Sequence, residues 1–368
     1  MSATRSVSRL LGIALLLAAP RAAAGATLTV NDFGADCAFP ASHTTIQGAV
    51  NAAKLSGAKR IHVCPGTYSE LVTIDGFGTL TLEADPGALL RPPGPVGSAT
   101  LLEVRDSRRV VVRGLELDGD GQFSGPGVTI RGIAFLDSSG TIEGNSIVGI
   151  RTEPFTPSFA HAIDVADNDG KVRITIRDNT LSGYGQHGMD VKARSVKILD
   201  NVLTGIGATD VESQIGIILR GVPRGRVSGN SIGFHWHTLF RGATGIYLEE
   251  SSRIRVEGNS LLDNHSGIEI VSSATSASRN RVSNNDVNGA DFGIAVDGAV
   301  SAPAEGNRIT GNRVGGDGDG GVTGIEISGD ALSTRITGNE IADFVQPLED
   351  LGTGTKWTSN LCDGAACP

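Results

Sequence analysis

Residues 253–271 read RIRVEGNSLLDNHSGIEIV, and this stretch contains the unit from which most of the chain is built. Asn259 is followed two places later by Leu261, and a Gly-Ile-Glu-Ile segment begins at Gly267. Residues 253–256 alternate polar and apolar side chains, which gives a β-strand one exposed and one buried face. The stretch therefore predicts short β-strands joined at corners that Gly and Asn occupy.

The same unit returns every two to three dozen residues. Its Asn stands at Asn145, Asn179, Asn201, Asn230, Asn259, Asn285, Asn312 and Asn339, with spacings of 34, 22, 29, 29, 26, 27 and 27 residues. Its second strand begins at Gly132, Ala162, Gly188, Gly216, Gly245, Gly267, Gly293 and Gly324. Repeats of this length are stacked units that cannot bury their apolar faces alone. The sequence predicts an all-β fold, a right-handed parallel β-helix of about ten coils.

Composition agrees with a coil that has many tight turns. The 368 residues include 51 Gly, and aromatic residues make up only 4%. The formal net charge of −9 argues against general nucleic-acid binding. We expect the repeated Asn side chains to stack at one corner and to hydrogen-bond the turns above and below them, without a chemical role.

The first 26 residues have the pattern of a secretion signal. Arg5 and Arg9 precede an apolar run over residues 10–19, and small residues follow at 22–24. The run is too short to span a bilayer permanently. We expect cleavage near Ala24 or Ala26, a secreted protein in the extracellular space or the periplasm, and no membrane span.

Three further regions follow the signal. Residues 27–60 are predicted to form an N-terminal cap, with a strand over 27–34 and a helix over 45–56 that Gly57 ends. Residues 61–345 form the β-helix, and residues 346–368 cap its other end. The helix would cover the open end of the coil with its apolar side, which consists of Ile46, Ala49, Val50 and Ala53.

The four cysteines all lie near the ends of the chain: Cys37, Cys64, Cys362 and Cys367. Export favours disulfides, most simply Cys37–Cys64 and Cys362–Cys367. A zinc site is the alternative, but the spacing does not resemble a cluster of zinc ligands.

A family resemblance rests on the first part of this pattern. Residues 45–53, followed by Val63-Cys64-Pro65-Gly66-Thr67-Tyr68-Ser69-Glu70, resemble the opening of the pectin-lyase-like superfamily. The later Gly-Asn-x-Ile and Gly-Ile-x-Val units resemble its parallel β-helix repeats. The resemblance covers nearly all of the chain after residue 26. It implies the fold but no single activity, because this fold carries lyases, hydrolases, esterases, epimerases and inert surface proteins.

Alternation along the Gly-Ile-x-Val strands separates inward from outward side chains. Ile163, Val165, Met189 and Val191 are among those expected to point inward. Because neighbouring coils lie about 4.8 Å apart, one outward cluster is predicted across three adjacent coils, with Asp164 one coil away. Its members are Asp190, Lys192, Arg220, Tyr247 and Glu249.

Three long excursions between strands are predicted to wall a groove over this cluster: residues 151–160, 206–214 and 233–243. Residues 184–245 are also locally basic, with seven Lys or Arg, three His and four acidic residues. An acidic polysaccharide would suit such a groove. The predicted substrate-binding residues are Asp164, Tyr247, Glu249, His235, Trp236 and Arg241.

A uronate-containing polymer offers a specific chemistry for the cluster. A base must remove the proton on C5, and cations must offset the charge that grows on the carboxylate. Loss of the C4 substituent then gives lysis, and reprotonation from the other face gives epimerisation. Lys192 or His187 is the predicted base, Arg220 the charge stabiliser, and Asp190 an orienting carboxylate.

Two enzyme groups of this fold are similar at these positions. Met189-Asp190-Val191-Lys192-Ala193 and Ile217-Ile218-Leu219-Arg220-Gly221 resemble the Lys and Arg strands of alginate and chondroitin lyases. The calcium-binding Glu-x-Glu of those lyases is replaced by Gly185 and His187. Residues 187–192 are also similar to the Tyr-Gly-Phe-Asp-Pro-His strand of alginate C5-epimerases.

Two other readings stay open. A non-catalytic β-helix that binds glycans or partner proteins would bind without turnover, and a copper-handling relative of this fold is disfavoured by only two Met. No metal site is assigned; calcium is the one cofactor left open, with residues 315–320 (Gly-Gly-Asp-Gly-Asp-Gly) as a calcium-like loop. We expect a monomer.

Overall fold

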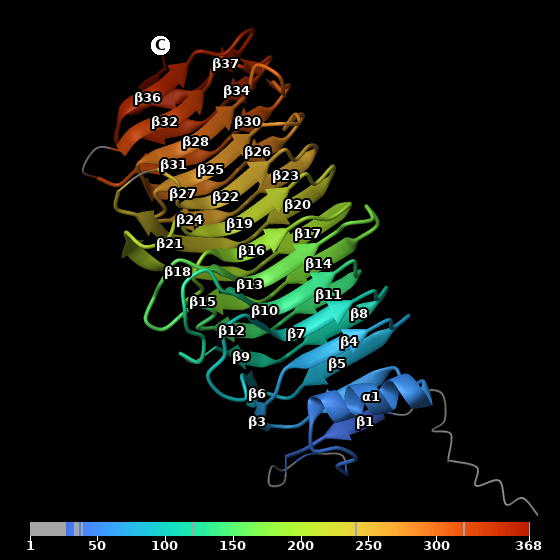
Figure 1. The fold of residues 1–368 in the computed structure, drawn as a ribbon. Helices are drawn as coiled ribbons and strands as arrows, with labels where there is room; N and C mark the ends of the chain where they lie inside the picture. The colour runs from blue at the N-terminus through green and yellow to red at the C-terminus, as the bar shows by residue number, and fades with distance from the viewer. Residues whose placement is uncertain are drawn as a thin grey trace, which may run out of the picture.

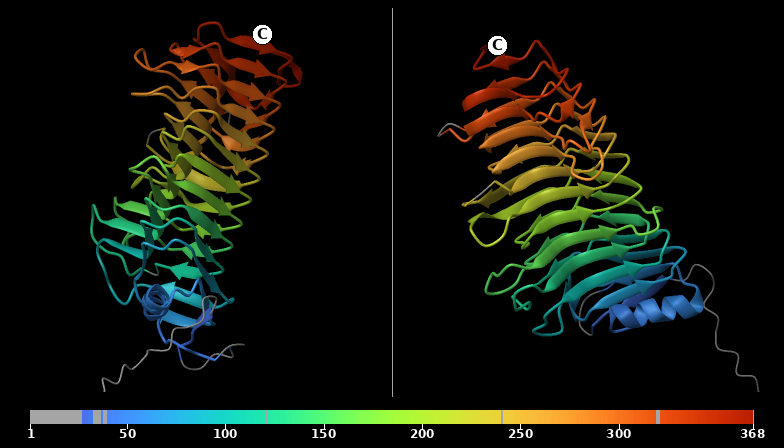
Figure 2. Two further views of the ribbon diagram at one scale, coloured as in Figure 1. Left: turned by 90° about the vertical axis from the view of Figure 1, so that its right-hand side faces the viewer. Right: turned by 45° about the horizontal axis from the view of Figure 1, so that its top comes forward.

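The computed structural model describes residues 27–32, 37, 40–119, 121–239, 241–318 and 321–367. The predicted secretion signal, residues 1–26, lies outside this part of the chain. The described residues form an elongated stack of coils that runs from the N-terminal end (blue) to the C-terminal end (red) (Figure 1). Successive coils lie one above another in both further views (Figure 2), and they contribute strands to three long sheets, here called sheets A, B and C.

The strands of all three sheets are given with their bounds. Sheet A contains β1 (Thr27–Val30), β2 (Arg60–Val63), β5 (Leu80–Ala84), β8 (Val110–Arg113), β11 (Gly140–Glu143), β14 (Arg173–Arg177), β17 (Ser195–Leu199), β20 (Gly225–Ser228), β23 (Ile254–Glu257), β26 (Arg281–Ser283), β30 (Arg308–Thr310), β34 (Arg335–Thr337) and β37 (Lys356–Thr358). Sheet B contains β3 (Gly66–Ser69), β6 (Ala88–Arg91), β9 (Glu116–Asp118), β12 (Ser146–Val148), β15 (Thr180–Ser182), β18 (Val202–Thr209), β21 (Ser231–His237), β24 (Ser260–Leu262), β27 (Asp286–Ala290), β31 (Arg313–Gly316), β35 (Glu340–Ala342), β38 (Leu361–Cys362) and β39 (Ala365–Ala366). Sheet C contains β4 (Val72–Asp75), β7 (Ala99–Arg105), β10 (Thr129–Leu136), β13 (Phe159–Ala166), β16 (His187–Val191), β19 (Ile215–Arg220), β22 (Thr244–Glu249), β25 (Ser266–Val271), β28 (Phe292–Asp297), β32 (Gly321–Ile327) and β36 (Phe344–Asp350).

Two short strands, β29 (Ala304–Glu305) and β33 (Ala331–Leu332), pair outside the three sheets. Neighbouring strands within the sheets pair in parallel, except β38 and β39, which are antiparallel at the C-terminal end. The predicted parallel β-helix is therefore confirmed. Its strands continue past residue 345, since β36, β37 and β38 each pair with a strand of the preceding coil.

The core is the interior of the coil, filled by Ile, Val and Leu from all three sheets. The predicted inward residues of sheet C are buried, with Ile163, Met189 and Ile217 at 0% exposure. The recurring Gly permits the coils to stack this closely. A Cβ on Gly188 would lie 2.6 Å from the carbonyl oxygen of Gly216, closer than real Cβ contacts come, so the column at the start of these strands tolerates only very small residues.

The repeated Asn residues form the expected ladder at one corner. Nδ2 of Asn201 donates to Oδ1 of Asn230 at 2.9 Å and to the carbonyl of Ile176 at 3.1 Å. The same pattern continues from Asn145 to Asn360, one Asn beyond the predicted series. Each amide replaces water for buried backbone groups of the turns, which is why one residue type recurs at this corner.

Helix α1 (Ile46–Ser56) covers the N-terminal end of the stack, as predicted (Figure 1). The side chain of Thr45 caps its first turn, and Gly57 ends it with φ 77°. Its buried residues are the four predicted ones, Ile46, Ala49, Val50 and Ala53. The Glu70 carboxylate accepts hydrogen bonds from the backbone amides of Ile46 and Gln47 at 2.7 and 3.0 Å, which favours a helix N-terminus.

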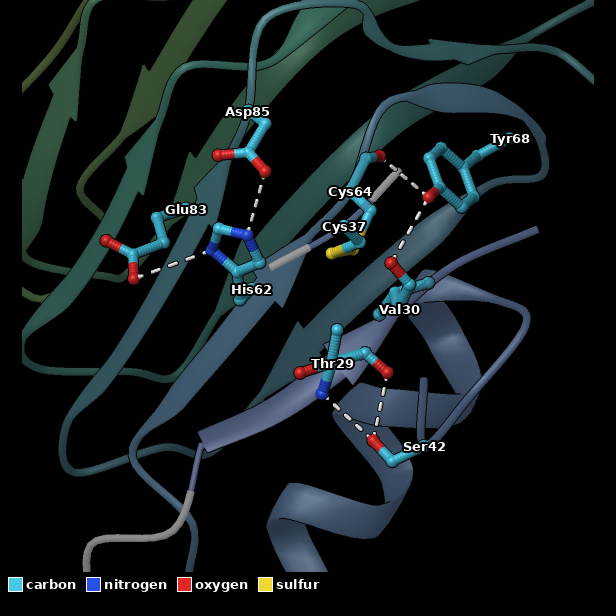
Figure 3. Close-up of a disulfide and its surroundings, with 9 residues drawn as sticks. All are labelled: Thr29, Val30, Cys37, Ser42, His62, Cys64, Tyr68, Glu83 and Asp85. Carbon is cyan, nitrogen blue, oxygen red and sulfur yellow. Dashed lines mark hydrogen bonds and ion pairs between the residues drawn. A yellow bond between two sulfur atoms is a disulfide. The ribbon is translucent and has the colours of Figure 1, made fainter. Parts of the chain in front are cut away.

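Both predicted disulfides are present. Cys37–Cys64 joins the N-terminal cap to the end of β2, and Cys362–Cys367 closes the C-terminal hairpin. Figure 3 shows the first one between two polar groupings: His62 beside Glu83 and Asp85, and the buried Tyr68 hydroxyl, which donates to the carbonyl of Cys64 at 2.8 Å. Among the described residues, no helix is long and apolar enough to cross a membrane.

Candidate active site on the outer face of sheet C

Strand register gathers polar side chains on the outer face of sheet C. In one row, Asp164 pairs with Asp190, Asp190 with Ile218, and Ile218 with Tyr247. A second row places His161 beside His187, and a third places Arg220 beside Glu249. The pairing skips the small-residue column at positions 162, 188 and 216. This irregularity puts His187 on the same face as Asp190, although the two residues stand three positions apart in sequence.

Two histidines stack at the centre of this face. The rings of His161 and His187 lie with centroids 4.7 Å apart and planes inclined by 25°. Nδ1 of His187 is 3.0 Å from Oδ2 of Asp190, while a ring nitrogen of His161 is 3.2 Å from Oε1 of Gln186. His187 is 5% exposed and His161 9% exposed. The pair therefore lies at the floor of the outer face, held on one side by a carboxylate.

Arg220 connects this floor to the next coil. Its Nε donates to both carboxylate oxygens of Asp190, at 3.1 and 3.2 Å, and its Nη1 donates to Glu249. The third nitrogen of the guanidinium, Nη2, has no hydrogen-bond partner among the described residues, and the side chain is 38% exposed. Arg220 thus offers one free edge to a ligand above the sheet.

Burial and charge set the protonation of the central pair. Burial lowers the pKa of His187 to about 4, against the opposing effect of Asp190, so this imidazole is neutral near pH 7. For Asp190, burial raises the pKa, but the hydrogen bond from His187 and the charges of His161 and Arg220 outweigh it and hold the pKa at about 2. The arrangement at neutral pH is a carboxylate beside a neutral imidazole, which suits a general base.

Two residues missed by the sequence interpretation complete the cluster. Arg131 donates from Nε to Asp164, with its side chain 30% exposed, and His161 lies between Asp164 and Asp190. Both occupy the column that also contains His187, since Arg131 pairs with His161 and His161 with His187. Aligning the residue just before each repeated Gly would have revealed this column.

Two of the three predicted excursions, residues 151–160 and 206–214, are joined beside this cluster. Glu212, from the excursion over 206–214, accepts hydrogen bonds from the backbone amide of Ser158 at 3.0 Å and from the side chain of Gln186 at 3.4 Å. Burial raises the pKa of Glu212. Because Gln186 also contacts His161, the two excursions are tied to the edge of the histidine pair and form a wall beside it.

Lys192 makes no side-chain hydrogen bond or ion pair with the other members of the predicted cluster. Strand β16 ends at Val191, and Lys192 is exposed, with no side-chain hydrogen bond or ion pair to a described residue. Its backbone amide still donates to the carbonyl of Val165 at 2.8 Å, and the register of β16 with β19 puts it beside Arg220, so its place in the outward cluster stays a prediction. Its charge still faces solvent next to the end of this strand.

The structure places the predicted substrate-binding residues His235, Trp236 and Arg241 in different environments. His235 is wrongly assigned to substrate binding, because it lies on sheet B with 0% exposure and its ring nitrogens bond to Tyr184 and Asn264 inside the coil. Trp236 is half-buried and stacks on His265 at 5.0 Å, which favours packing of its own excursion. Phe240 lies outside the described residues.

Arg241 organises a second polar cluster further along the same face. Its guanidinium donates to Glu269 at 3.4 Å and to Glu326 at 2.6 Å, and it lies over the ring of Phe292 at 4.1 Å. Burial and nearby Glu269 and Glu249 raise the pKa of Tyr247 to about 12, so its hydroxyl is protonated. Burial raises the pKa of Asp297 to about 6, against the charge of Arg241 and with Glu326 and Glu269 adding to the rise.

Three groups of described residues offer ligand atoms close enough for a metal ion, but in one of them, Cys37, His62 and Cys64, a disulfide joins the two cysteines. His161, His187 and Asp190 have ligand atoms within 4.8 Å of one another, a set that suits a transition metal. Asp137, Asp167 and Asp169 meet the same distance criterion, but Asp167 already accepts from the backbone amides of Val172 and Arg194. The calcium-like loop over 315–320 is described only as far as Gly318.

Comparisons with known proteins agree with this architecture. A family model described as "Right handed beta helix region" matches residues 161–341. The chain is a right-handed parallel β-helix. No curated protein sequence matches it significantly.

The β-helix is similar to solved structures of low sequence identity. One is the catalytic unit of a GH87 α-1,3-glucanase from Streptomyces thermodiastaticus, with 16% identity, TM-score 0.57, and 92% of this chain and 70% of that chain covered. A second is DFA-IIIase from Arthrobacter chlorophenolicus A6, with 15% identity, TM-score 0.52, and 92% and 94% covered. A third is the Dettilon tailspike protein, with 16% identity, TM-score 0.53, and 87% and 59% covered, so the chain spans less than two thirds of that protein. These likenesses show the fold.

Proposed function

We propose that this β-helix is a secreted enzyme that removes the C5 proton of a uronate residue in an acidic polysaccharide, as a lyase or a C5-epimerase. The observation that carries the proposal is the stacked pair of His161 and His187 on the outer face of sheet C, oriented by Asp190 and flanked by Arg131 and Arg220. The two disulfides and the sequence of residues 1–26 support export.

His187 is the base in this scheme. If Nδ1–H donates to Asp190, the lone pair of Nε2 is free, and no described residue bonds to that atom. The proton on C5 passes to Nε2, and the electron pair of the C–H bond moves into the uronate carboxyl group. The free edges of the Arg220 and Arg131 guanidinium groups are suited to stabilise the dianion that results.

The second half of the reaction decides between lysis and epimerisation. In lysis, the C4–O bond breaks, a C4–C5 double bond forms, and the departing oxygen takes a proton. In epimerisation, C5 takes a proton on the opposite face. Tyr247, protonated because its pKa is about 12 and placed two strands from Asp190 in the same row, is the candidate donor in either case.

One experiment tests for lysis and for epimerisation, with the wild-type protein and the His187→Gln variant. Purified protein is incubated with alginate, polygalacturonate and glycosaminoglycans, and the ultraviolet absorbance of an unsaturated uronate is recorded, followed by exchange of the C5 proton in deuterated water. We expect one of the two signals on one polymer and its loss in His187→Gln. Absence of both signals on every polymer, with binding retained, would replace this proposal by a glycan-binding role.

Glycoside hydrolysis is a second candidate, favoured by Asp297. A carboxyl group with a pKa of about 6, beside Arg241 and the carboxylates Glu269 and Glu326, has the character of a catalytic acid whose partner stays ionised. The GH87 α-1,3-glucanase shares this fold. Release of reducing ends without an unsaturated product, lost in Asp297→Asn and retained in His187→Gln, would select this reaction instead.

A further inference from the structure

A column of cations runs along the outer face of sheet A, far from the histidine pair of sheet C in the strand pattern. Strand register places its members directly beside one another, coil after coil, from β17 to β37 (Figure 1). We call this set the cationic ladder, and it consists of Lys197, Arg226, Arg255, Arg281, Arg308, Arg335 and Lys356.

The ladder is exposed and mostly uncompensated. All seven side chains belong to exposed residues. Arg226 pairs with Glu257 at 2.7 Å, but no ion pair or side-chain hydrogen bond joins another ladder residue to any described residue. Two residues further along each strand, Thr310, Thr337 and Thr358 lie beside the last three rungs and are at least partly exposed, while Ser283 in the same column is buried. The neighbours of these rungs therefore carry hydroxyl groups and not carboxylates, which would have neutralised the positive charges.

The N-terminal half of the same sheet shows the opposite arrangement. There the ladder's own column holds the uncharged Thr81, Val111, Thr141 and Thr175. The next outward column alternates in sign, since Arg113 bridges Glu83 and Glu143, and Arg177 also pairs with Glu143. Like charges directly opposite each other on neighbouring strands destabilise a sheet. Six successive like-charge neighbours in a protein of net charge −9 are therefore an unfavourable feature of the free protein, and a bound polyanion would relieve it.

The ladder also has a shape. Arg255, Arg281, Arg308, Arg335 and Lys356, together with Arg279, line a groove of about 590 Å³. Six strand spacings of about 4.8 Å make the ladder straight and about 29 Å long. A duplex of B-DNA carries its charges at about 1.7 Å intervals along a winding path, which fits a straight column of this spacing poorly. An extended 1,4-linked uronate chain carries one carboxylate per sugar at intervals close to one strand spacing.

We propose that the cationic ladder is a second, non-catalytic binding surface for a linear acidic polysaccharide with one carboxylate per sugar. The chain lies along the coil axis, with its carboxylates on the Arg and Lys side chains and its sugar hydroxyls on Thr310, Thr337 and Thr358. This assignment rests on the proposed function for the identity of the polymer, whereas the surface itself rests on the ladder. It would hold a long polymer while another part of that polymer, or a neighbouring one, enters the site on sheet C.

The test compares two triple variants of the full mature chain. R281Q/R308Q/R335Q removes three adjacent rungs, and K59Q/R108Q/R313Q removes three exposed cations elsewhere, Arg313 at a similar level of the stack but on sheet B. Affinity for long and short oligomers of alginate and polygalacturonate is measured by calorimetry at low and raised salt. Circular dichroism and thermal unfolding verify that both variants fold like the wild type.

We expect the ladder variant to bind long oligomers about 100-fold more weakly, from the strength of single Lys or Arg contacts with an anionic surface. The control variant should match the wild type, and raised salt should weaken wild-type binding. Equal affinity of the two triple variants would overturn the ladder as a site. Ladder-dependent binding of DNA or heparin without binding of polyuronates would overturn the polymer assignment.

The same variants separate this proposal from the proposed function. The ladder variant should keep full turnover on short oligomers, which need only the sheet C site, and His187→Gln should bind long oligomers with wild-type affinity while turning none over. If His187→Gln and the ladder variant both bind weakly, the two surfaces are one site, and the proposal of a separate surface fails.

Discussion

Nδ1 of His187 lies 3.0 Å from Oδ2 of Asp190, although the two residues stand three positions apart on one strand. A regular β-strand would send these two side chains to opposite faces, since successive side chains alternate. The skipped column at Gly188 brings them to the same face. The small residue that lets the coils stack is thus also the reason that a carboxylate orients an imidazole on the outer surface.

This contact gives the first prediction. Asp190→Asn removes the negative charge and one of the two acceptor oxygens that His187 and Arg220 share, so the ring of His187 is held less firmly. Turnover on the uronate polymer should fall by roughly 10²- to 10⁴-fold, the usual contribution of general base catalysis. Steady-state rates measure the loss, and Asp210→Asn, an exposed carboxylate in the excursion over 206–214, is the matched control. Equal rates in the two variants would contradict the role of Asp190.

The second prediction concerns Asp297. Its pKa is raised from 3.8 to about 6 in the folded protein, so folding favours the protonated acid. The stability that this gives is present below pH 4 and is lost as the pH rises through 6, which leaves a buried carboxylate at a disadvantage near pH 8. Asp297→Asn should therefore raise the free energy of unfolding by roughly 2–3 kcal/mol at pH 8 and change it little at pH 4.

Thermal unfolding at the two pH values measures this effect. The exposed Asp210→Asn variant should show no such difference. A destabilised Asp297→Asn variant at pH 8 would mean that Arg241 compensates the carboxylate fully. If the stabilised variant has also lost glycoside hydrolysis, the free-energy cost of ionising Asp297 would be linked to catalysis. Groups with displaced pKa values often stand at active sites.

The sequence was sufficient for the architecture because each coil repeats the same physical requirement. Inward Ile163 and Met189, the Asn ladder, and the capping helix with Ile46 and Val50 facing the core all follow from local alternation and turn chemistry. Each of these features depends on residues near one another in sequence. They are visible in any single repeat and are reinforced by the others.

The site was only partly predictable, because it depends on register between repeats of unequal length. Asp190, Arg220 and Glu249 were grouped correctly, but Arg131 and His161 were missed because the column before the repeated Gly was not aligned. His235 was placed on the surface because its excursion is long, yet it continues a sheet B strand whose alternate residues face inward. The cationic ladder was missed because it, too, becomes visible only once repeats of unequal length are aligned in register.

The third prediction tests the Asn ladder. Asn230 donates from Nδ2 to Asn259 and to the carbonyls of Ile198 and Ser228, and its Oδ1 accepts from the backbone amide of Asn201. Asn230→Ala leaves several of these buried groups unpaired, at about 1–3 kcal/mol for each group that water cannot reach. We expect a loss of several kcal/mol in urea unfolding.

Asn288→Ala is the control for this loss. Asn288 is half-buried, and within the described part of the chain its side chain donates only to Asp286, at 3.0 Å. Its removal should cost less than about 1 kcal/mol, as for an ordinary polar contact near the surface. Similar losses in both variants would show that the ladder adds no more than any other amide.

The last prediction follows from the buried His235. Its ring bonds to Tyr184 and Asn264 with no charged partner, and burial lowers its pKa from 6.5 to about 4. Above pH 6.5 the ring is neutral in both the folded and the unfolded chain, so it adds no pH dependence. As the pH falls from 6.5 to 4, the unfolded chain takes up a proton that the folded protein refuses, and stability falls by about 3 kcal/mol. Below pH 4 both states are protonated, and the loss stops.

His187 adds to this loss in the same direction, since burial also lowers its pKa to about 4. His235→Gln, which keeps a side chain able to hydrogen-bond with Asn264, should therefore remove about half of the loss between pH 6.5 and pH 4. Unfolding free energies measured across this range in the wild type and the variant give the two slopes directly. A variant slope as steep as that of the wild type would mean that His235 gains a proton inside the coil as readily as in water, which its surroundings of Tyr184 and Asn264 do not support.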